Sequence, residues 1–183
     1  MKRFGLMSLA TGLLSLALPA HAALDVGSKA PLFTLQASLA GKPFTFTLAD
    51  ALKEGPVVLY FYPAAFTPGC TIEAHDFAEA MPQFKSLGAQ VIGVSHDTID
   101  TLNRFSVSEC QSKFPVAADA DMSVAKSYKA VLVPLGGWAS RTSYVIAPDG
   151  RIIYSYADLD PDDHVANTLR ALAAWRAEHG ANR

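Results

Sequence analysis

Cys70 stands at the junction between an apolar run and an amphipathic segment, and its thiol is well placed to act as a nucleophile. Residues 57–62, VVLYFY, predict a strand buried on both faces. If Thr67 is the N-cap of the following helix and Pro68 its first residue, Cys70 lies in the first turn. Free N–H groups and the helix dipole favour a thiolate there, and the thiolate is the reactive form of cysteine. The sequence therefore predicts a reactive cysteine at the carboxyl end of a strand, where ligand sites in α/β sheets commonly lie.

Cys110 is the other of the chain's two cysteines, and it leaves two interpretations open. A permanent disulfide with Cys70 would close a loop of about 40 residues and contribute roughly a few kcal/mol of stability. A redox pair would instead cycle between thiol and disulfide. A C-x-x-C pair, which a thiol-disulfide oxidoreductase or a cytochrome-maturation reductase would use, does not occur in the sequence.

The first 22 residues have the composition of an export signal. Lys2 and Arg3 precede an apolar stretch at 4–18, and residues 20–22 read AHA, which predicts cleavage after Ala22. An uncleaved membrane anchor is the alternative, but the apolar stretch is shorter than the about 20 residues that a bilayer requires. We therefore expect an exported, periplasmic protein, in a compartment that permits disulfides.

The composition is that of a folded protein without a strongly charged face. The chain has 183 residues, of which 50% are hydrophobic and 17% charged. This length favours one domain, here residues 23–183 after removal of the leader. Removing Lys2 and Arg3 leaves 13 basic residues against 17 acidic ones and changes the net charge from -2 to -4. Such a balance argues against a nucleic-acid partner and against membrane association of the mature form.

Strand and helix patterns alternate along the chain, which predicts an α/β fold with a mostly parallel sheet covered on both faces. We expect strands at 33–35 and 44–48, forming an opening hairpin, and at 57–62, 91–94, 142–146 and 152–156. Apolar residues at helical spacing within 74–84, 99–105 and 165–172 mark three helices, the second of which frays near Cys110. Pro82 is expected to kink the first helix and Gly88 to end it. Residues 148–150, PDG, predict a hairpin turn. Asp160 is expected to cap the last helix, with Pro161 as its first residue.

Pro63, Thr67 and Cys70 fit the signature P-x-x-x-T-x-x-C, and in this the chain resembles the peroxiredoxins of the alkyl hydroperoxide reductase and thiol-specific antioxidant family. The string FYPAAFTPGCTIEA is similar to the Q-type subgroup, which includes bacterioferritin comigratory protein. The resemblance continues through VIGVSHD and RTSYVIAPDGRI and covers nearly all of the mature chain. It implies a thioredoxin-like fold, with a central mixed sheet flanked by helices and an N-terminal β-hairpin.

The resemblance also implies thiol-dependent reduction of hydrogen peroxide and organic hydroperoxides, an antioxidant activity that needs no metal or organic cofactor. Cys70 occupies the peroxidatic position. The Thr67 hydroxyl and the Arg141 guanidinium would bind the peroxide, and the fixed positive charge of Arg141 would favour the Cys70 thiolate. Pro63 would shield the thiolate from water. Glu73 would either join a hydrogen-bond network with Arg141 or serve only as a carboxylate near the helix dipole.

Attack on peroxide leaves a sulfenic acid that a second thiol must resolve. The commonest Q-type pattern places the resolving cysteine five residues after Cys70, where this chain has His75. We expect Cys110 to resolve instead, through an intramolecular Cys70–Cys110 disulfide. Because a disulfide needs Cα atoms roughly 4.4 to 6.8 Å apart, both segments are expected to unwind locally. The alternatives are a one-cysteine cycle with an external thiol, a bridge between two chains, and a noncatalytic exported domain with a structural disulfide.

The sequence says less about the electron donor and about the roles of the remaining polar and aromatic residues. An exported thioredoxin-like protein or another small thiol is the expected electron donor, and the resemblance favours a monomer. His75 is predicted at the surface or at a pocket rim and His96 in a loop. Trp138 and Trp175 are predicted to be packing residues, with Trp138 the better candidate for contact with a substrate because it follows two glycines.

Overall fold

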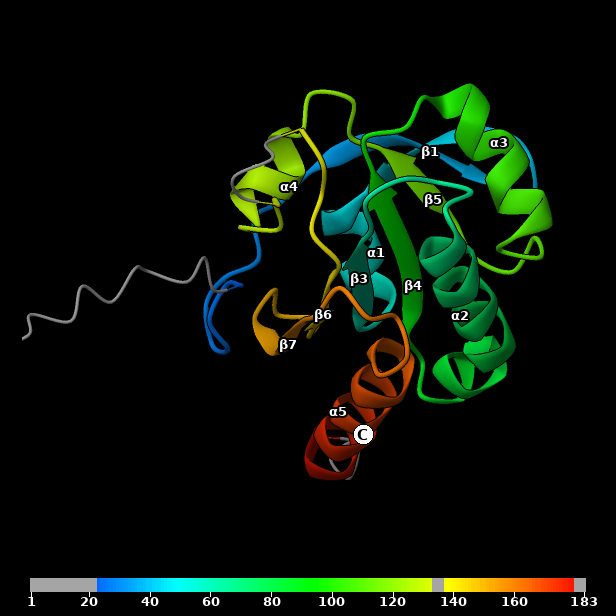
Figure 1. Cartoon of the computed structure of the whole chain (residues 1–183). Coiled ribbons are helices and arrows are strands. Elements are labelled where there is room, and N and C mark those ends of the chain that lie inside the picture. Colours follow the sequence, from blue (N-terminus) through cyan, green and yellow to red (C-terminus); the bar gives the residue numbers. More distant parts are fainter. Residues whose placement is uncertain (1–22, 133–136, 180–183) are drawn as a thin grey trace, which may run out of the picture.

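The computed structural model describes residues 23–132 and 137–179, and the predicted leader and its cleavage site lie outside this part of the chain. It contains a seven-stranded sheet in the order β2-β1-β5-β4-β3-β6-β7 (Figure 1). The strands are β1 (Thr34–Leu39), β2 (Lys42–Thr47), β3 (Val57–Phe61), β4 (Gln90–Ser95), β5 (Val116–Ala118), β6 (Thr142–Ile146) and β7 (Ile152–Ala157). The helices are α1 (Leu48–Glu54), α2 (Pro68–Ser86), α3 (Ile99–Ser108), α4 (Ser123–Ser127) and α5 (His164–His179).

The sheet is mixed, as the family resemblance implies. Only β3–β4 and β4–β5 pair in parallel, whereas β1–β2, β1–β5, β3–β6 and β6–β7 are antiparallel. The expectation of a mostly parallel sheet was therefore wrong. The two tight hairpins account for part of the difference, because strands joined by a short turn pair antiparallel.

Helices cover both faces of the sheet and enclose two cores. Buried residues of α2, α3 and α5 form one apolar cluster, and those of α1 and α4 form the other on the opposite face (Figure 1). β3 lies between β4 and β6, next to the middle strand, and all five of its residues are buried. The apolar run at 57–62 reflects this position, because side chains on both faces of the strand pack against a core.

Several elements differ from the sequence prediction. Helices α1 and α4 and the short strand β5 were not predicted. α5 begins at His164, so Pro161 is not its first residue. The Asp160 carboxylate instead accepts a hydrogen bond from the Asp162 N–H at 3.1 Å, within the turn before the helix. α2 continues past Pro82 to Ser86, and Gly88 follows it with φ +66°. Within the described ranges, no helix is both long and apolar enough to span a membrane.

Candidate active site

The loop from β3 to α2 places Cys70 as the sequence predicts. Thr67 is the N-cap residue with an extended backbone, Pro68 opens the helix, and Cys70 is the third helical residue. The first N–H groups of a helix have no carbonyl of a preceding turn to bond to, so they point toward the space in front of the helix. Cys70 itself is 1% exposed, which places its thiol in a largely dry environment.

Asp97, just after β4, fixes the start of this loop. Its Oδ2 atom accepts hydrogen bonds from the Ala65 N–H at 2.7 Å and from the Ser95 hydroxyl at 2.8 Å. Phe66 follows with φ +64°, a conformation that non-glycine residues rarely adopt, and its ring packs edge-on against Phe105. The loop is therefore held at both its backbone and its side chains before the helix begins.

Thr67 makes a different hydrogen bond from the one expected of it. Its hydroxyl donates to the Ala64 carbonyl at 3.0 Å and makes no capping bond to the helix. Because the hydroxyl proton is engaged, the Thr67 oxygen can offer a further partner only an acceptor. Pro63 opens the loop and is partly buried.

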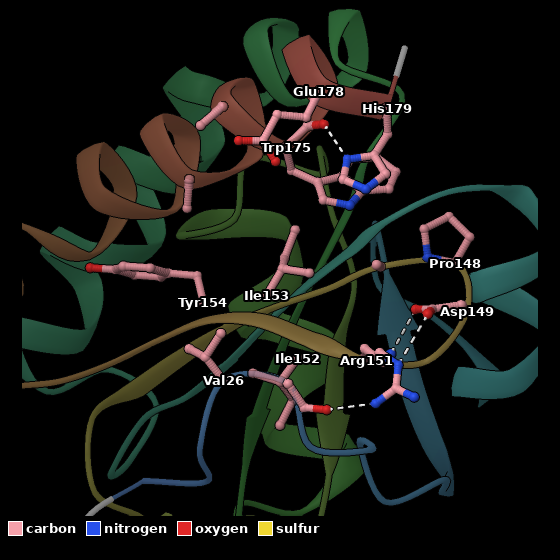
Figure 2. Close-up of a pocket in the computed structure, with 14 residues that line it drawn as sticks. Val26, Pro148, Asp149, Arg151, Ile152, Ile153, Tyr154, Trp175, Glu178 and His179 are labelled. Carbon is pink, nitrogen blue, oxygen red and sulfur yellow. Dashed lines mark hydrogen bonds and ion pairs between the residues drawn. The ribbon is translucent and has the colours of Figure 1, made fainter. Parts of the chain in front are cut away.

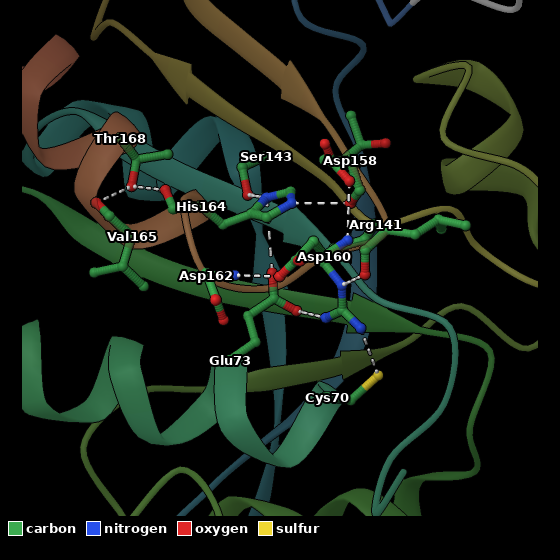
Figure 3. A network of polar contacts seen from close by, with 12 residues as sticks. Cys70, Glu73, Arg141, Ser143, Asp158, Asp160, Asp162, His164, Val165 and Thr168 are labelled. Atoms are coloured by element: carbon green, nitrogen blue, oxygen red, sulfur yellow. Dashed lines mark hydrogen bonds and ion pairs between the residues drawn. The ribbon is translucent and has the colours of Figure 1, made fainter. Parts of the chain in front are cut away.

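Arg141, just before β6, reaches three partners with its guanidinium (Figure 3). Nη2 lies 3.6 Å from the Cys70 sulfur, Nη1 forms an ion pair with Glu73 Oε2, and Nε donates to the Leu159 carbonyl at 2.9 Å. Burial alone would lower the pKa of Arg141, but Glu73 and Cys70 raise it above its ordinary value. The guanidinium is therefore a fixed cation directed at the sulfur.

Gly69 allows this close approach. A Cβ atom on Gly69 would lie 3.1 Å from Arg141 Nη2, closer than ordinary van der Waals contact. The residue before Cys70 therefore has to lack a side chain for the guanidinium to keep its position. The sequence prediction assigned Gly69 no role.

Glu73 joins the network with Arg141, which was one of its two predicted roles. It is fully buried, and burial raises its pKa from 4.5 to about 8 although Arg141 opposes the shift. Beyond it lie two residues that sequence reasoning missed. The His164 Nδ1 atom is 2.8 Å from the Ser143 hydroxyl and 3.8 Å from Glu73 Oε1, and its Nε2 atom is 3.0 Å from the Asp158 carbonyl. A serine inside the apolar-rich strand TSYVI was the one local signal for this cluster.

Cys110 is fully buried just after the end of α3, and it is not bonded to Cys70. Both thiols belong to the same apolar cluster, on the face of the sheet that α2 and α3 cover. Burial, with a smaller contribution from Glu109, raises the pKa of the Cys110 thiol far above its ordinary value. The resting state therefore holds Cys110 as a neutral thiol.

Comparison with known proteins agrees with this geometry. Residues 26–155 match the AhpC/TSA family. The chain belongs to this family. It is 30% identical over 152 residues to peroxiredoxin Bcp of Xanthomonas campestris, a match that covers 79% of this chain and 92% of that protein. It is 34% identical over 147 residues to the chloroplastic peroxiredoxin Q of Oryza sativa subsp. japonica, covering 80% of this chain and 65% of the rice protein.

Among solved structures, peroxidoxin BcpB from Mycobacterium tuberculosis superposes with a TM-score of 0.76 at 30% identity, covering 82% of this chain and 97% of that one. Together these similarities identify the chain as a Q-type peroxiredoxin of the AhpC/TSA family with a thioredoxin-like fold. The family resemblance inferred from the sequence motifs is confirmed.

Other residues singled out in this AhpC/TSA family member lie where the sequence places them. The His75 side chain is 44% exposed, and His96 follows β4. Trp138 packs edge-on against His96 with ring centroids 4.9 Å apart, and Trp175 stacks on His179 at 5.0 Å. Trp175 packs against the apolar cluster of α2, α3 and α5, as expected, whereas Trp138 is 44% exposed.

Two hollows border different parts of this peroxiredoxin. A cavity of about 750 Å³ lies between β7 and the end of α5, with Trp175 and His179 on one side and Ile153 on the other (Figure 2). Its lining contains no cysteine, so it is not the thiol site. A hollow of about 710 Å³ is lined by residues that include Phe66 and Val107, and it therefore borders the loop that carries Cys70.

Proposed function

We propose that the protein is a thiol-dependent peroxidase that reduces hydrogen peroxide and organic hydroperoxides through Cys70. The observation that carries the proposal is the 3.6 Å contact between Arg141 Nη2 and the buried Cys70 sulfur in the first turn of a helix. A cation and free N–H groups both stabilise a thiolate. The nearby Thr67 oxygen is an acceptor for the proton of a hydroperoxide.

The reaction balances without a metal or an organic cofactor. The Cys70 thiolate attacks one oxygen of the hydroperoxide, an S–O bond forms, and the O–O bond breaks. The sulfur loses two electrons and becomes a sulfenic acid, while the leaving oxygen takes up a proton and departs as water or an alcohol. As the O–O bond breaks, negative charge develops on the leaving oxygen. Arg141 and the N–H groups of the first turn stabilise this charge, and they are already in place before the reaction begins.

Cys110 resolves the sulfenic acid in our proposal. Its thiol condenses with the oxidised Cys70, so that an S–S bond forms and water leaves. Both thiols are buried in the resting state, so the segments that carry them must rearrange first. The backbone after Cys110 supports this, because Gln111 and Ser112 both have positive φ, a conformation that costs free energy for non-glycine residues. An external thiol, or a cysteine of a second chain, is the alternative resolver.

The electron donor is proposed from the leader sequence. Export after cleavage at Ala22 would place the protein with periplasmic dithiols, so a thioredoxin-like protein or another small thiol of that compartment would reduce the disulfide. The donor would leave oxidised, and both cysteines would return as thiols. A monomer is sufficient for this cycle. The N-terminal sequence of the exported protein tests the location, since it should begin at Ala23.

Stopped-flow peroxide consumption followed by mass spectrometry tests the reaction. The reduced wild type should consume one peroxide per chain rapidly and end with a Cys70–Cys110 disulfide. Cys70→Ser should abolish the rapid phase, and Cys110→Ser should stop at an oxidised Cys70. A wild type no faster than a free thiol would contradict the peroxidase. A fast Cys110→Ser protein that recycles normally would instead support an external resolver.

A further inference from the structure

The carboxylate that holds Arg141 is itself incompletely bonded. Glu73 Oε2 pairs with Arg141, but Oε1 is buried and has no hydrogen-bond partner in the described part of the chain. A buried carboxylate oxygen without a partner is costly, because it has lost its water without compensation. A group that can carry a proton toward it is His164 Nδ1, at 3.8 Å (Figure 3).

The contacts of His164 define which of its nitrogens is available. Nε2 faces the Asp158 carbonyl, which can only accept, so Nε2 carries the proton of the neutral ring. Nδ1 is then an acceptor for the Ser143 hydroxyl, and it lies 3.8 Å from Glu73 Oε1. Two acceptor atoms this close in a buried site repel each other. One proton on either atom removes the repulsion, and the Ser143 hydroxyl, which can rotate, then donates elsewhere when Nδ1 is engaged by that proton.

The net charge of the buried site also favours one bound proton. A Cys70 thiolate, a charged Arg141 and an ionised Glu73 together carry one net negative charge in a buried environment. One proton on Glu73 or on His164 makes the whole set neutral. With the proton on Glu73, the carboxyl no longer competes with the thiolate for the guanidinium charge, and with the proton on His164, the imidazolium offsets the charge of the carboxylate.

We propose that His164, held by Ser143 and by the Asp158 carbonyl, is a positioning residue for the peroxidatic site. It shares one proton with Glu73 Oε1 and thereby keeps the positive charge of Arg141 available to the Cys70 thiolate. The proposal rests on the proposed function of Cys70. The pair titrates as a unit, because the proton that one atom loses is taken up by the other.

The surroundings favour retention of this proton. Burial raises the pKa of Glu73 and lowers that of His164, which directs the shared proton toward the carboxyl. The titratable and charged groups that face the pair are Tyr60 on β3, Asp76 on α2, Arg141 before β6, Tyr156 on β7, and Asp158 and Asp163 on the segment before α5. The three aspartates favour the protonated pair and Arg141 opposes it.

The segment between β7 and α5 supports this role through two successive carbonyls. The Asp158 carbonyl accepts from His164 and the Leu159 carbonyl accepts from Arg141, so one turn of backbone fixes both ends of the network. His164 is fully buried, and its ring packs against Tyr156 with centroids 4.8 Å apart. The histidine is thus held at a fixed place relative to the guanidinium.

The His164→Gln variant tests whether His164 acts through a shared proton or only by packing. A glutamine donates an N–H toward Oε1 but cannot take up a proton, so Glu73 stays ionised and draws on the Arg141 charge. In a Cys110→Ser background, where only Cys70 absorbs as a thiolate at 240 nm, we expect the thiolate fraction at pH 7 to fall about tenfold. The second-order rate with hydrogen peroxide should fall in the same proportion. His179→Gln, on the exposed end of α5, is the matched control and should change neither value.

A double-mutant cycle gives the decisive comparison. In a Glu73→Gln background there is no carboxylate to neutralise, so His164→Gln should have no further effect on the thiolate fraction. Additive effects, or an unchanged thiolate fraction in a folded His164→Gln protein, would overturn the proposal. Should that variant unfold, ¹⁵N spectra of the wild-type His164 ring decide, because they must change when Cys70 is alkylated. The peroxidase assignment fails on a separate result, a Cys70→Ser protein with the wild-type rate.

Discussion

The Nε2 atom of His75 lies 3.1 Å from the Oε2 atom of Glu109, so a partly exposed pair joins α2 to the residue just before Cys110. His75 occupies the position, five residues after Cys70, at which the commonest Q-type pattern has its resolving cysteine. In this chain the position therefore contacts the segment that carries the second thiol. The pair spans the two segments that our proposed disulfide requires to rearrange.

Removing this pair should speed resolution. Exposed polar pairs of this kind contribute about 0.2 to 1 kcal/mol, so His75→Ala should raise the rate of disulfide formation about 1.4- to fivefold. Rapid quenching with a thiol-alkylating reagent, followed by mass spectrometry, measures that rate against the preceding peroxide step. Lys53→Ala breaks an exposed pair with Asp50 far from both thiols and serves as the control. Slower resolution in His75→Ala would show that the pair guides the rearrangement instead of restraining it.

Gly69→Ala should impair activity without loss of stability. The added methyl would meet Arg141 Nη2 at 3.1 Å, so the guanidinium must move by a few tenths of an ångström. Alanine in a helix is favoured over glycine by up to about 1 kcal/mol, so the melting temperature should not fall. We expect about a tenfold lower rate with peroxide, because small misplacements of a catalytic group are costly. Ser86→Ala, at an exposed position of the same helix, is the control, and equal rates in both variants would exclude a requirement for close approach.

Local signals in the sequence were sufficient for the position of the thiol. Thr67 and Pro68 are adjacent start signals of a helix, and they place Cys70 in its first turn without any tertiary information. The contact between Cys70 and Arg141 joins residues 71 positions apart, and only the family resemblance indicated it. Such a contact depends on β3 and β6 being neighbours in the sheet, which no local pattern encodes.

The site residues that the sequence did not predict depend on contacts between elements that are distant in the chain. His164 was not predicted because it begins α5 and bonds to a carbonyl and a serine from other elements. Asp160 and Pro161 have the sequence of a helix start, yet the backbone there forms a turn in which the Asp160 side chain bonds to Asp162. A capping motif and a turn motif use the same aspartate geometry, so the sequence alone does not separate them.

Arg141→Lys should lose most of the peroxidase activity although the charge is kept. Lysine offers a single ammonium and cannot bond Cys70, Glu73 and the Leu159 carbonyl from one planar group. Loss of a preorganised donor of this kind costs about 10² to 10³ in rate. Stopped-flow kinetics with hydrogen peroxide measures the loss, and Arg151→Lys, an exposed arginine in the β6–β7 hairpin, is the control. A rate within a factor of about three of wild type would mean that charge alone is sufficient.

Glu73→Gln should change how stability depends on pH. Because the pKa of Glu73 is raised from 4.5 to about 8 by burial, the folded protein keeps a proton at pH values where the unfolded chain has lost it. This contribution to stability is present below about pH 4.5 and is lost as the pH rises through about 8. The uncharged glutamine has no such loss. Urea unfolding at intervals from pH 5 to pH 8 should therefore show the variant gaining stability relative to wild type as the pH rises.

The other buried titrating group of the network does not obscure this comparison. Burial lowers the pKa of His164, so its contribution changes in the opposite direction, with stability gained as the pH rises toward 6.5. Because His164 is present in both proteins, the part of its contribution that does not depend on Glu73 cancels in the difference, and the difference reports the titration of the coupled pair. Glu54→Gln, at an exposed position in α1, should give a difference that is flat over the same range. A flat difference for Glu73→Gln as well would mean that Arg141 keeps Glu73 ionised in the folded protein, and the shared proton with His164 would then have no basis.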